Sequence, residues 1–237
     1  FPGLARSYRR LAAAMLEARQ LAGLASAREG LRRAIAPERV WPARAFFFAK
    51  RDELRARHAR YGDTADNLEP NVKEGPGGLR DLQTLRWMAL RIAGTPDLQS
   101  LVALGQLGQD EYATLDRQRL VLSRLRFGLH LVAGKREERL RFDHQKALAA
   151  RLGHVDDADT LAVERMMQEF YRAAALVIRI GDRLLQRFEE QLEGEGAPMP
   201  IDDAFEPPRG YVAARDPQRP RTPAAVFALF SVWPGRD

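Results

Sequence analysis

Apolar residues recur at helical spacing along most of this 237-residue chain, whereas alternation with a period of two is nearly absent. Apolar side chains three or four positions apart share one face of a helix, so the pattern predicts an all-α fold, mainly a helical bundle with little or no sheet. The expected helices cover residues 4–22, 25–35, 42–60, 79–92, 109–133, 143–152 and 160–192.

Residues at the ends of these segments favour similar boundaries. Gly23, Gly94 and Gly134 each follow a helical segment, and glycine enters the left-handed conformation that ends a helix without a Cβ penalty. Pro42 suits the first turn of a helix, where its missing N–H would be unpaired in any case. Asp159 is the expected N-cap of the last long helix.

Two long apolar stripes mark the predicted core. Because both segments are amphipathic and long, we expect them to pack antiparallel in the bundle. The first stripe contains Leu115, Leu122, Leu125, Leu129 and Val132, and the second contains Met167, Phe170, Ala174, Val177, Leu184, Phe188 and Leu192.

Two segments interrupt the helical pattern. Residues 62–78 hold four glycines, two prolines and two asparagines, which predicts a long irregular loop that is either functional or disordered. After residue 193 the composition shifts to Gly, Pro and acidic residues, which is typical of a linker. The remaining tail is expected to hold one short strand at 211–213 and a helical turn or two at 223–230.

Composition and charge exclude several classes of protein. The absence of Cys excludes a disulfide framework and a thiolate zinc site, and we expect a cytoplasmic protein without a membrane span. The net charge is +6, but the basic residues stand in mixed-sign runs such as 50–53 and 135–139, typical of solvated helix faces. No nucleic-acid partner is therefore expected; an RNA-binding protein would instead lose affinity steeply with salt. The chain begins without Met, so we expect a fragment or a processed form.

No complete catalytic or metal centre is visible in the sequence. Asp157 and Asp159 have the spacing by which nucleotidyltransferases hold two magnesium ions, but they precede a long helix rather than ending a strand, so we expect capping. Walker loops and Ser-centred nucleophile motifs are also absent. The four histidines lack metal-binding spacing and are expected to be surface or core residues: His58, His130, His144 and His154.

The most informative segment is 67–83, with the sequence NLEPNVKEGPGGLRDLQ. A glycine-rich turn that opens a helix can present unpaired N–H groups to an anion, and nearby Lys and Arg add charge. The alternative is a tight turn that only starts a helix. In that case Asp81 stabilises the positive end of the helix dipole, and Arg80 forms an ion pair with a neighbouring residue. The candidate residues for binding a nucleotide or a partner are Asn67, Glu69, Lys73, Gly77, Gly78, Arg80 and Asp81.

This segment resembles the family of bifunctional uridylyltransferase/uridylyl-removing enzymes that modify the nitrogen-signalling protein PII. The resemblance rests on residues 67–70 and 73–83, and a similar Gly-Gly-hydrophobic-Arg-acidic motif occurs in the related glutamine synthetase adenylyltransferase. Departures stand at Tyr8, where the family has an acidic residue, and at Asp66, where it has Tyr. Further matching segments follow in the same order: 16–23, 55–61, 126–130, 140–143, 163–167 and 184–188.

The resemblance implies a domain order and a function. Residues 1–61 would be the last helices of a nucleotidyltransferase domain, 62–193 a helical domain, and 194–237 a linker and the start of a further, incomplete domain. Both metal centres of the family would lie outside this chain, so Mg²⁺ and UTP are implied for the family and none is expected to bind this chain alone. The implied partners are PII and the rest of the parent polypeptide.

In this interpretation the chain helps to shape the nucleotide or PII cleft and is inactive in isolation. Gly77 and Gly78 would then allow close backbone approach, while Asp81 would orient Arg80 or cap the helix rather than bind metal. The alternative is a stand-alone helical protein-interaction module without catalysis.

Overall fold

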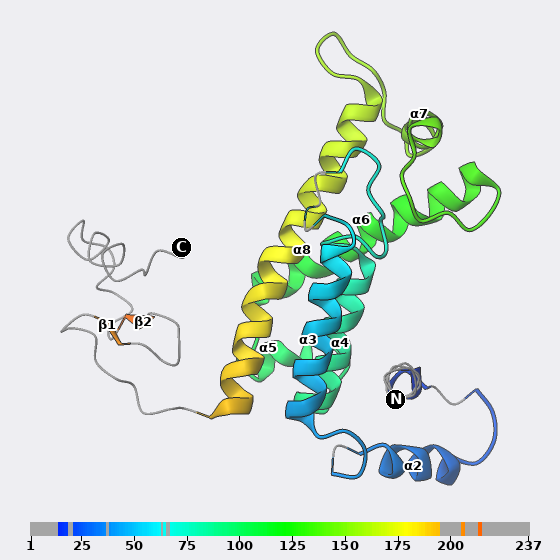
Figure 1. Ribbon diagram of the computed structural model, residues 1–237. Helices are drawn as coiled ribbons and strands as arrows, with labels where there is room; N and C mark the ends of the chain where they lie inside the picture. Colours follow the sequence, from blue (N-terminus) through cyan, green and yellow to red (C-terminus); the bar gives the residue numbers. More distant parts are fainter. Residues whose placement is uncertain are drawn as a thin grey trace. The chain divides into compact units, whose positions relative to one another are not determined.

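The computed structural model describes residues 14–18, 21–36, 38–62, 64 and 67–194, together with the backbone of 205–206 and 213–214. The described residues are overwhelmingly helical, as predicted (Figure 1). The helices are α2 (Ala25–Ala34), α3 (Ala43–Ala59), α4 (Leu79–Ala93), α5 (Ser100–Ala103), α6 (Gln109–Ala133), α7 (Phe142–Arg151) and α8 (Ala162–Glu193).

Two compact units, Phe1–Phe188 and Glu189–Asp237, make up the chain. In the described part of the second unit, β1 (Phe205–Glu206) pairs antiparallel with β2 (Ala213–Ala214). Of the short strand expected at 211–213, Ala213 is described and belongs to β2, whereas residues 211–212 and the turns expected at 223–230 lie outside the described residues. The domain boundaries at 61/62 and 193/194 stay predictions.

Most helix boundaries follow the sequence pattern, but the short helix α5 is not among the expected ones, and three further details differ. In the first segment the described helical residues are 14–16, and residues 21–24 are not helical, because Gly23 takes a left-handed φ of 94° in the turn before α2. Pro42 is the N-cap of α3 rather than a first-turn residue, with an extended ψ of 147°. The N-terminus of α8 is capped by Asp156, whose Oδ1 accepts the Ala162 N–H at 2.7 Å, and not by Asp159.

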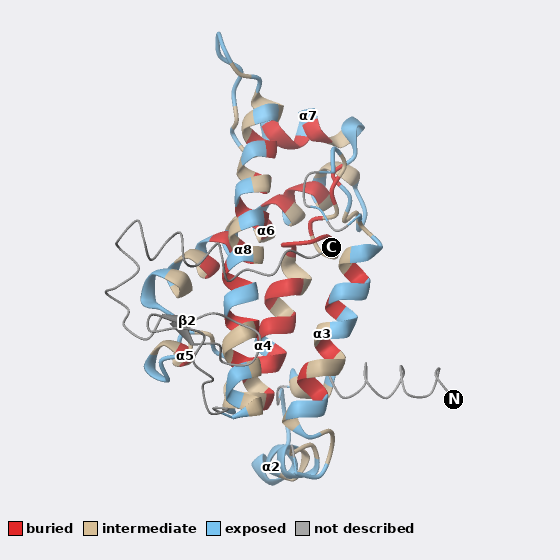
Figure 2. Cartoon of the chain, turned by 60° about the vertical axis from the view of Figure 1, so that its left-hand side comes forward, coloured by how far each residue is buried: buried red, intermediate tan, exposed pale blue. Residues whose placement is uncertain are grey.

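The core of the first unit is a layer of three helices. Helix α4 lies between α3 and α8, and the buried residues of all three face inward (Figure 2). The two predicted apolar stripes are buried, Leu129 of α6 and Phe170 of α8 among them, except that Val132 and Leu192 are only partly buried. The largest fully buried side chains of these helices are Phe46, Phe47, Leu85, Met88, Phe170 and Phe188.

Helix α6 does not run antiparallel along α8 as expected; it crosses α8 (Figure 1). It packs mainly against α7 and α4. Gly128 explains the preference for α7, since a Cβ at this position would lie 2.7 Å from the Leu148 side chain. An ion pair joins the two long helices: Glu111 at the start of α6 accepts from Arg187 of α8 at 2.9 Å.

In the described part of the chain, no helix is long and apolar enough to cross a membrane.

Candidate functional site

The glycine-rich loop before α4 closes on itself through its backbone. Residues 75–78 are all buried, so the turn has no open face. The N–H groups at the helix start therefore have internal acceptors, which contradicts the expected anion site built from unpaired backbone donors. Gly77 donates to Asp81 Oδ2 at 2.7 Å, Gly78 to Gly75 O at 3.0 Å, Leu79 to Val72 O at 3.1 Å, and Arg80 to Lys73 O at 2.8 Å.

The two adjacent glycines do allow close backbone approach, but to the protein itself. Gly77 has a left-handed φ of 72°, and a Cβ there would lie 2.3 Å from the carbonyl oxygen of Ala174 in α8. A Cβ on Gly78 would lie 2.7 Å from the carbonyl oxygen of Val72. The backbone of the turn therefore packs directly against α8, and the space beside both glycines is occupied by the protein's own backbone. Neither glycine leaves room for a ligand.

Asp81 is the acidic centre of a buried cluster between α3 and α4. Its side chain is 7% exposed, and it forms an ion pair with Arg57 Nη2 at 2.6 Å and a hydrogen bond with His58 Nε2 at 2.9 Å. Burial raises the pKa of nearby Asp182 on α8. The interaction with His58 lowers this pKa in part, whereas the negative charge of Asp81 raises it further. Asp81 therefore does not orient Arg80; it accepts the Gly77 N–H and ties the loop to α3.

Arg80 is instead held on the surface of α4. Its Nη2 lies 3.1 Å from Glu74 Oε1, and its guanidinium also donates to Gln83. The guanidinium carbon lies 5.7 Å from the centre of the Trp87 ring. These contacts match the alternative in which Arg80 pairs to neighbours, yet its side chain remains partly exposed.

Lys73 has a different environment. Its ammonium lies 3.9 Å from Glu74 Oε1 and 3.9 Å from Glu138 Oε1, and it makes no hydrogen bond to any described residue. The side chain is only 19% exposed. Burial lowers the pKa of Lys73, and the positive charge of Arg80 adds to the effect. Lys73 is thus a recessed cation whose hydrogen-bonding capacity is not used.

Glu138 joins Lys73 to α6 and to the loop that follows it. Arg126 donates two hydrogen bonds to the Glu138 carboxylate, from Nε to Oε2 at 2.6 Å and from Nη2 to Oε1 at 2.7 Å. Arg136 donates a third, from Nε to Oε1 at 3.2 Å. Burial disfavours ionisation of Glu138, but the hydrogen bonds and charge of Arg126 outweigh it and lower the pKa to about 2. The interpretation of 135–139 as a solvated face is therefore wrong for Glu138.

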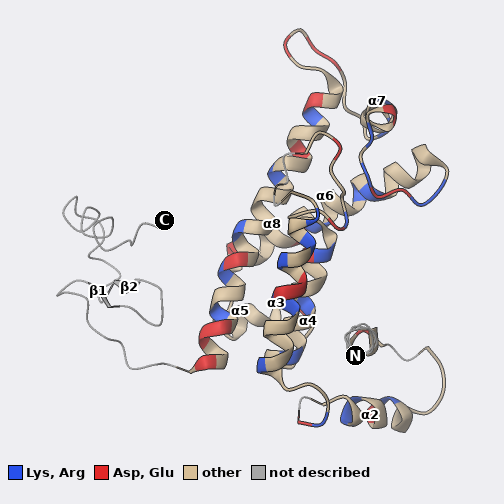
Figure 3. Ribbon diagram, in the orientation of Figure 1, with Lys and Arg blue, Asp and Glu red and all other residues tan. Residues whose placement is uncertain are grey.

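Backbone pairing holds these two loops together. An isolated antiparallel bridge joins Asn71 and Arg139, with the Val72 N–H donating to Glu138 O at 2.8 Å and the Leu140 N–H to Pro70 O at 2.9 Å. Figure 3 shows basic and acidic segments along the loop that connects α6 to α7.

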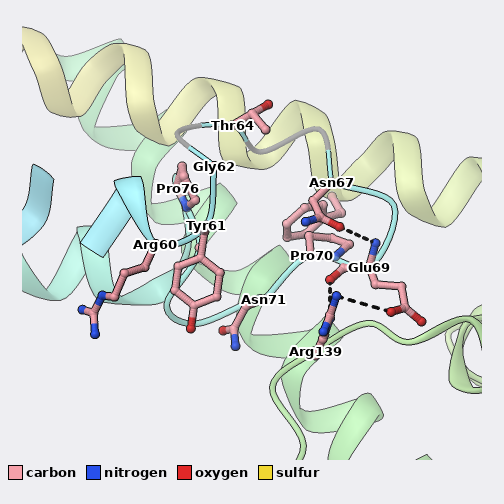
Figure 4. A pocket seen from close by; sticks show the side chains of 12 residues that line it. Arg60, Tyr61, Gly62, Thr64, Asn67, Glu69, Pro70, Asn71, Pro76 and Arg139 are labelled. Carbon is pink, nitrogen blue, oxygen red and sulfur yellow. Dashed lines mark hydrogen bonds and ion pairs between the residues drawn. The ribbon is translucent and has the colours of Figure 1, made fainter. Parts of the chain in front are cut away.

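Asn67 and Glu69 lie on another side of the loop, at the edge of a cavity of about 380 Å³ (Figure 4). Asn67 Oδ1 accepts the Glu69 N–H at 3.0 Å, and Arg139 Nε donates to Glu69 O at 3.1 Å. Tyr61 and Asn71 also line this cavity. The structure therefore brings Lys73 and Arg80 together near Glu74 and separates them from Asn67 and Glu69, which shape the turn.

Sequence reasoning missed Arg126, Arg136 and Glu138 as neighbours of Lys73. They come from a distant segment, and the available signal was the mixed-sign charge run. Asp157, considered as half of a metal pair, accepts the N–H groups of Asp159 and Thr160 through Oδ1 and so closes a turn in the loop before α8, rather than capping the helix as expected. Within the described ranges, no group of three or more His, Asp or Glu side chains could hold a metal ion.

Comparisons with known proteins identify the family of this chain. Residues 45–185 match the family described as GlnD PII-uridylyltransferase. A bifunctional uridylyltransferase/uridylyl-removing enzyme of Xanthomonas campestris pv. campestris is 61% identical over 221 residues, which cover 93% of this chain and 25% of that protein. The protein of the same name from Stutzerimonas stutzeri is 42% identical over 220 residues, covering 91% of this chain and 24% of that protein.

This chain therefore spans about a quarter of the length of these relatives. No solved structure matches it. The family match covers α3 through most of α8, including the loop before α4 and the Glu138 loop. On the extent of that match, the chain belongs to the GlnD PII-uridylyltransferase family.

Proposed function

We propose that this chain is the helical portion of a PII uridylyltransferase/uridylyl-removing enzyme, and that the start of α4 faces the cleft that holds the nucleotide or PII. The observation that carries the proposal is the placement of Lys73 and Arg80. Both are partly buried cations beside one rigid turn, and the Lys73 ammonium has no hydrogen-bond acceptor among the described residues. A recessed cation with unused donors is suited to an oxyanion.

The surrounding structure supports a positioning role. Gly77 seats the turn on α8, and the ion pair and hydrogen bond of Asp81 tie it to α3. Nucleotidyl transfer depends mainly on positioning and on electrostatic stabilisation of phosphate charge, so a fixed platform for two cations would contribute directly. Because the backbone N–H groups are already paired, the contact would be made by side chains alone.

The same proposal limits what the chain does by itself. Transfer from UTP to PII would use Mg²⁺ held by carboxylates elsewhere in the parent polypeptide. The 237-residue chain should therefore neither transfer nor remove a uridylyl group. Incubation of the purified chain with UTP, Mg²⁺ and PII tests this expectation, and turnover that survives stringent purification would contradict it.

The decisive test uses Lys73→Ala and Arg80→Ala in the full-length enzyme. We expect uridylyl transfer to fall by about 10-fold or more, equivalent to about 1.4 kcal/mol of transition-state stabilisation, while the free energy of unfolding barely changes. The matched control is Arg117→Ala, since Arg117 is an exposed α6 residue without an ion pair among described residues.

Two outcomes would overturn the proposal. Loss of stability with unchanged specific activity would assign Lys73 and Arg80 a structural role. Full activity and full stability would place the cleft elsewhere. If the chain is instead a stand-alone interaction module, uridylyl transfer by the full-length enzyme should not depend on either side chain.

A further inference from the structure

We propose that Lys73, Arg126, His130 and Arg136, gathered around Glu138, form a binding site for the phosphate groups of a nucleotide. This inference rests on the proposed function for the identity of the ligand, and it adds three residues that lie outside the glycine-rich segment. The site combines the loop before α4, the C-terminal half of α6, and the loop that follows α6.

The first argument is geometric. Glu138 Oε1 lies 3.9 Å from Lys73 Nζ and 3.2 Å from Arg136 Nε, while Oε2 lies 2.6 Å from Arg126 Nε and 3.7 Å from His130 Nε2. Four basic side chains from three segments thus converge on one carboxylate. The bridge between Asn71 and Arg139 fixes the loops that carry two of them.

The second argument concerns unused donors. The Lys73 ammonium makes no hydrogen bond to any described residue. The buried His130 Nε2 has no hydrogen-bond partner among them either, and it is a donor when the ring carries its proton there. The Arg136 guanidinium uses Nε for Glu138, and its side chain is 72% exposed, so its outer nitrogens can turn toward a ligand. Buried polar groups are normally paired, and each unpaired one calls for an explanation. A bound oxyanion would supply the missing acceptors.

The third argument is the local charge balance. Among the described residues, the ion pairs of Lys73, Arg80, Arg126 and Arg136 involve two carboxylates, those of Glu74 and Glu138. The four cations therefore exceed the two anions before the charge of His130 is considered. An excess of positive charge in a partly desolvated place attracts a small multivalent anion strongly, because water screens it less.

The depth of the cluster favours phosphate over an acidic protein surface. Lys73 is recessed, and Arg126 and His130 are about one-quarter to one-third exposed, so only Arg136 projects freely. A flat protein face would reach mainly Arg136, whereas a phosphate group is small enough to approach Lys73, whose side chain is still 19% exposed. Arg and Lys together suit phosphate, since Arg offers a planar fork and Lys a compact charge.

Binding of inorganic tripolyphosphate and of UTP to the 237-residue chain, measured by isothermal titration calorimetry at low salt, tests the site directly. Lys73→Gln and Arg136→Gln should each weaken tripolyphosphate binding by about 10-fold, as expected for loss of one charge-assisted contact. The control Arg117→Gln removes the same charge from the exposed face of α6 and should change affinity by less than about 2-fold. Circular dichroism melting checks that each variant is folded.

Arg136→Gln keeps the inference falsifiable if Lys73→Gln fails to fold, since the exposed Arg136 is the least structural member of the cluster. Absence of tripolyphosphate binding to the folded chain, or an equal loss in Arg117→Gln, would overturn the site. Binding of PII without binding of tripolyphosphate would assign the cluster to an acidic protein face and also overturn it.

The two proposals can fail separately. If Lys73→Ala and Arg80→Ala abolish transfer by the full-length enzyme while the chain binds no tripolyphosphate, the cleft assignment stands and the phosphate site falls. If the chain binds tripolyphosphate through Arg136 but both alanine variants keep full transfer, the phosphate site stands and the cleft assignment falls.

Discussion

Replacing Gly77 by Ala should destabilise the protein far more than the same change at Gly94. The two glycines flank α4 and have nearly the same left-handed φ, 72° at Gly77 and 73° at Gly94. They differ in what surrounds them. A Cβ at Gly77 would lie 2.3 Å from the carbonyl oxygen and 2.6 Å from the Cα of Ala174, whereas a Cβ at Gly94 meets nothing within 4 Å.

The expected magnitudes follow from this difference. Placing a Cβ in the left-handed region costs roughly 1–2 kcal/mol, and both variants share this cost. At Gly77 the new methyl group also collides with the backbone of α8, which cannot move as a side-chain end can. Overpacking of this kind typically costs about 1–3 kcal/mol more, so Gly77→Ala should lose roughly 2–5 kcal/mol in total.

Urea denaturation of the two variants and the wild-type chain, followed by circular dichroism, measures both losses. The slope of the free energy against urea concentration should be similar in all three, so that midpoints can be compared. An equal loss of stability in Gly77→Ala and Gly94→Ala would refute the reasoning. It would mean that the loop before α4 is not seated on α8.

Two further predictions concern packing and charge. Phe170→Ala should lower the free energy of unfolding by about 3–5 kcal/mol, because Phe170 is 1% exposed, whereas Phe127→Ala, at a residue 66% exposed, should change it by less than about 0.5 kcal/mol; urea denaturation compares them. The pKa of Glu138 is about 2 in the folded chain against an ordinary 4.5, so its contribution is present above pH 4.5 and is lost as the pH falls toward 2. Wild type should therefore exceed Glu138→Gln in stability by up to about 3 kcal/mol at pH 7, and the gap should narrow on titration to pH 3; a constant gap would contradict this.

The helices were largely predictable because their signals are local. The bounds of α6 follow from its apolar stripe and from Gly134, which takes a left-handed φ of 63°. The start of α8 was misplaced because three aspartates precede it, and only the folded loop shows that Asp156 caps the helix. The partner of α6 could not be predicted either, since an apolar stripe shows which face is buried but not which helix covers it.

The candidate site was predictable only in part, for the same reason. The sequence pointed to Lys73 and Arg80, and the structure places both beside Glu74. The expectation of free backbone donors failed, because their acceptors are carbonyl groups of the same loop and the Asp81 carboxylate. Contacts between Lys73 and Glu138 are long-range, and a single sequence offers no periodicity that reports them.

The bridge between Asn71 and Arg139 has a consequence for how the chain folds. Arg139 Nε donates to Glu69 O across 70 residues, so this contact closes a long loop that includes α4, α5 and α6. Such non-local contacts form slowly, because the chain must first lose conformational entropy to close the loop, and the contact stabilises the fold only afterwards. Glu138 follows Lys73 by many residues in the chain, so the Lys73 ammonium gains this neighbour only when the loop after α6 docks.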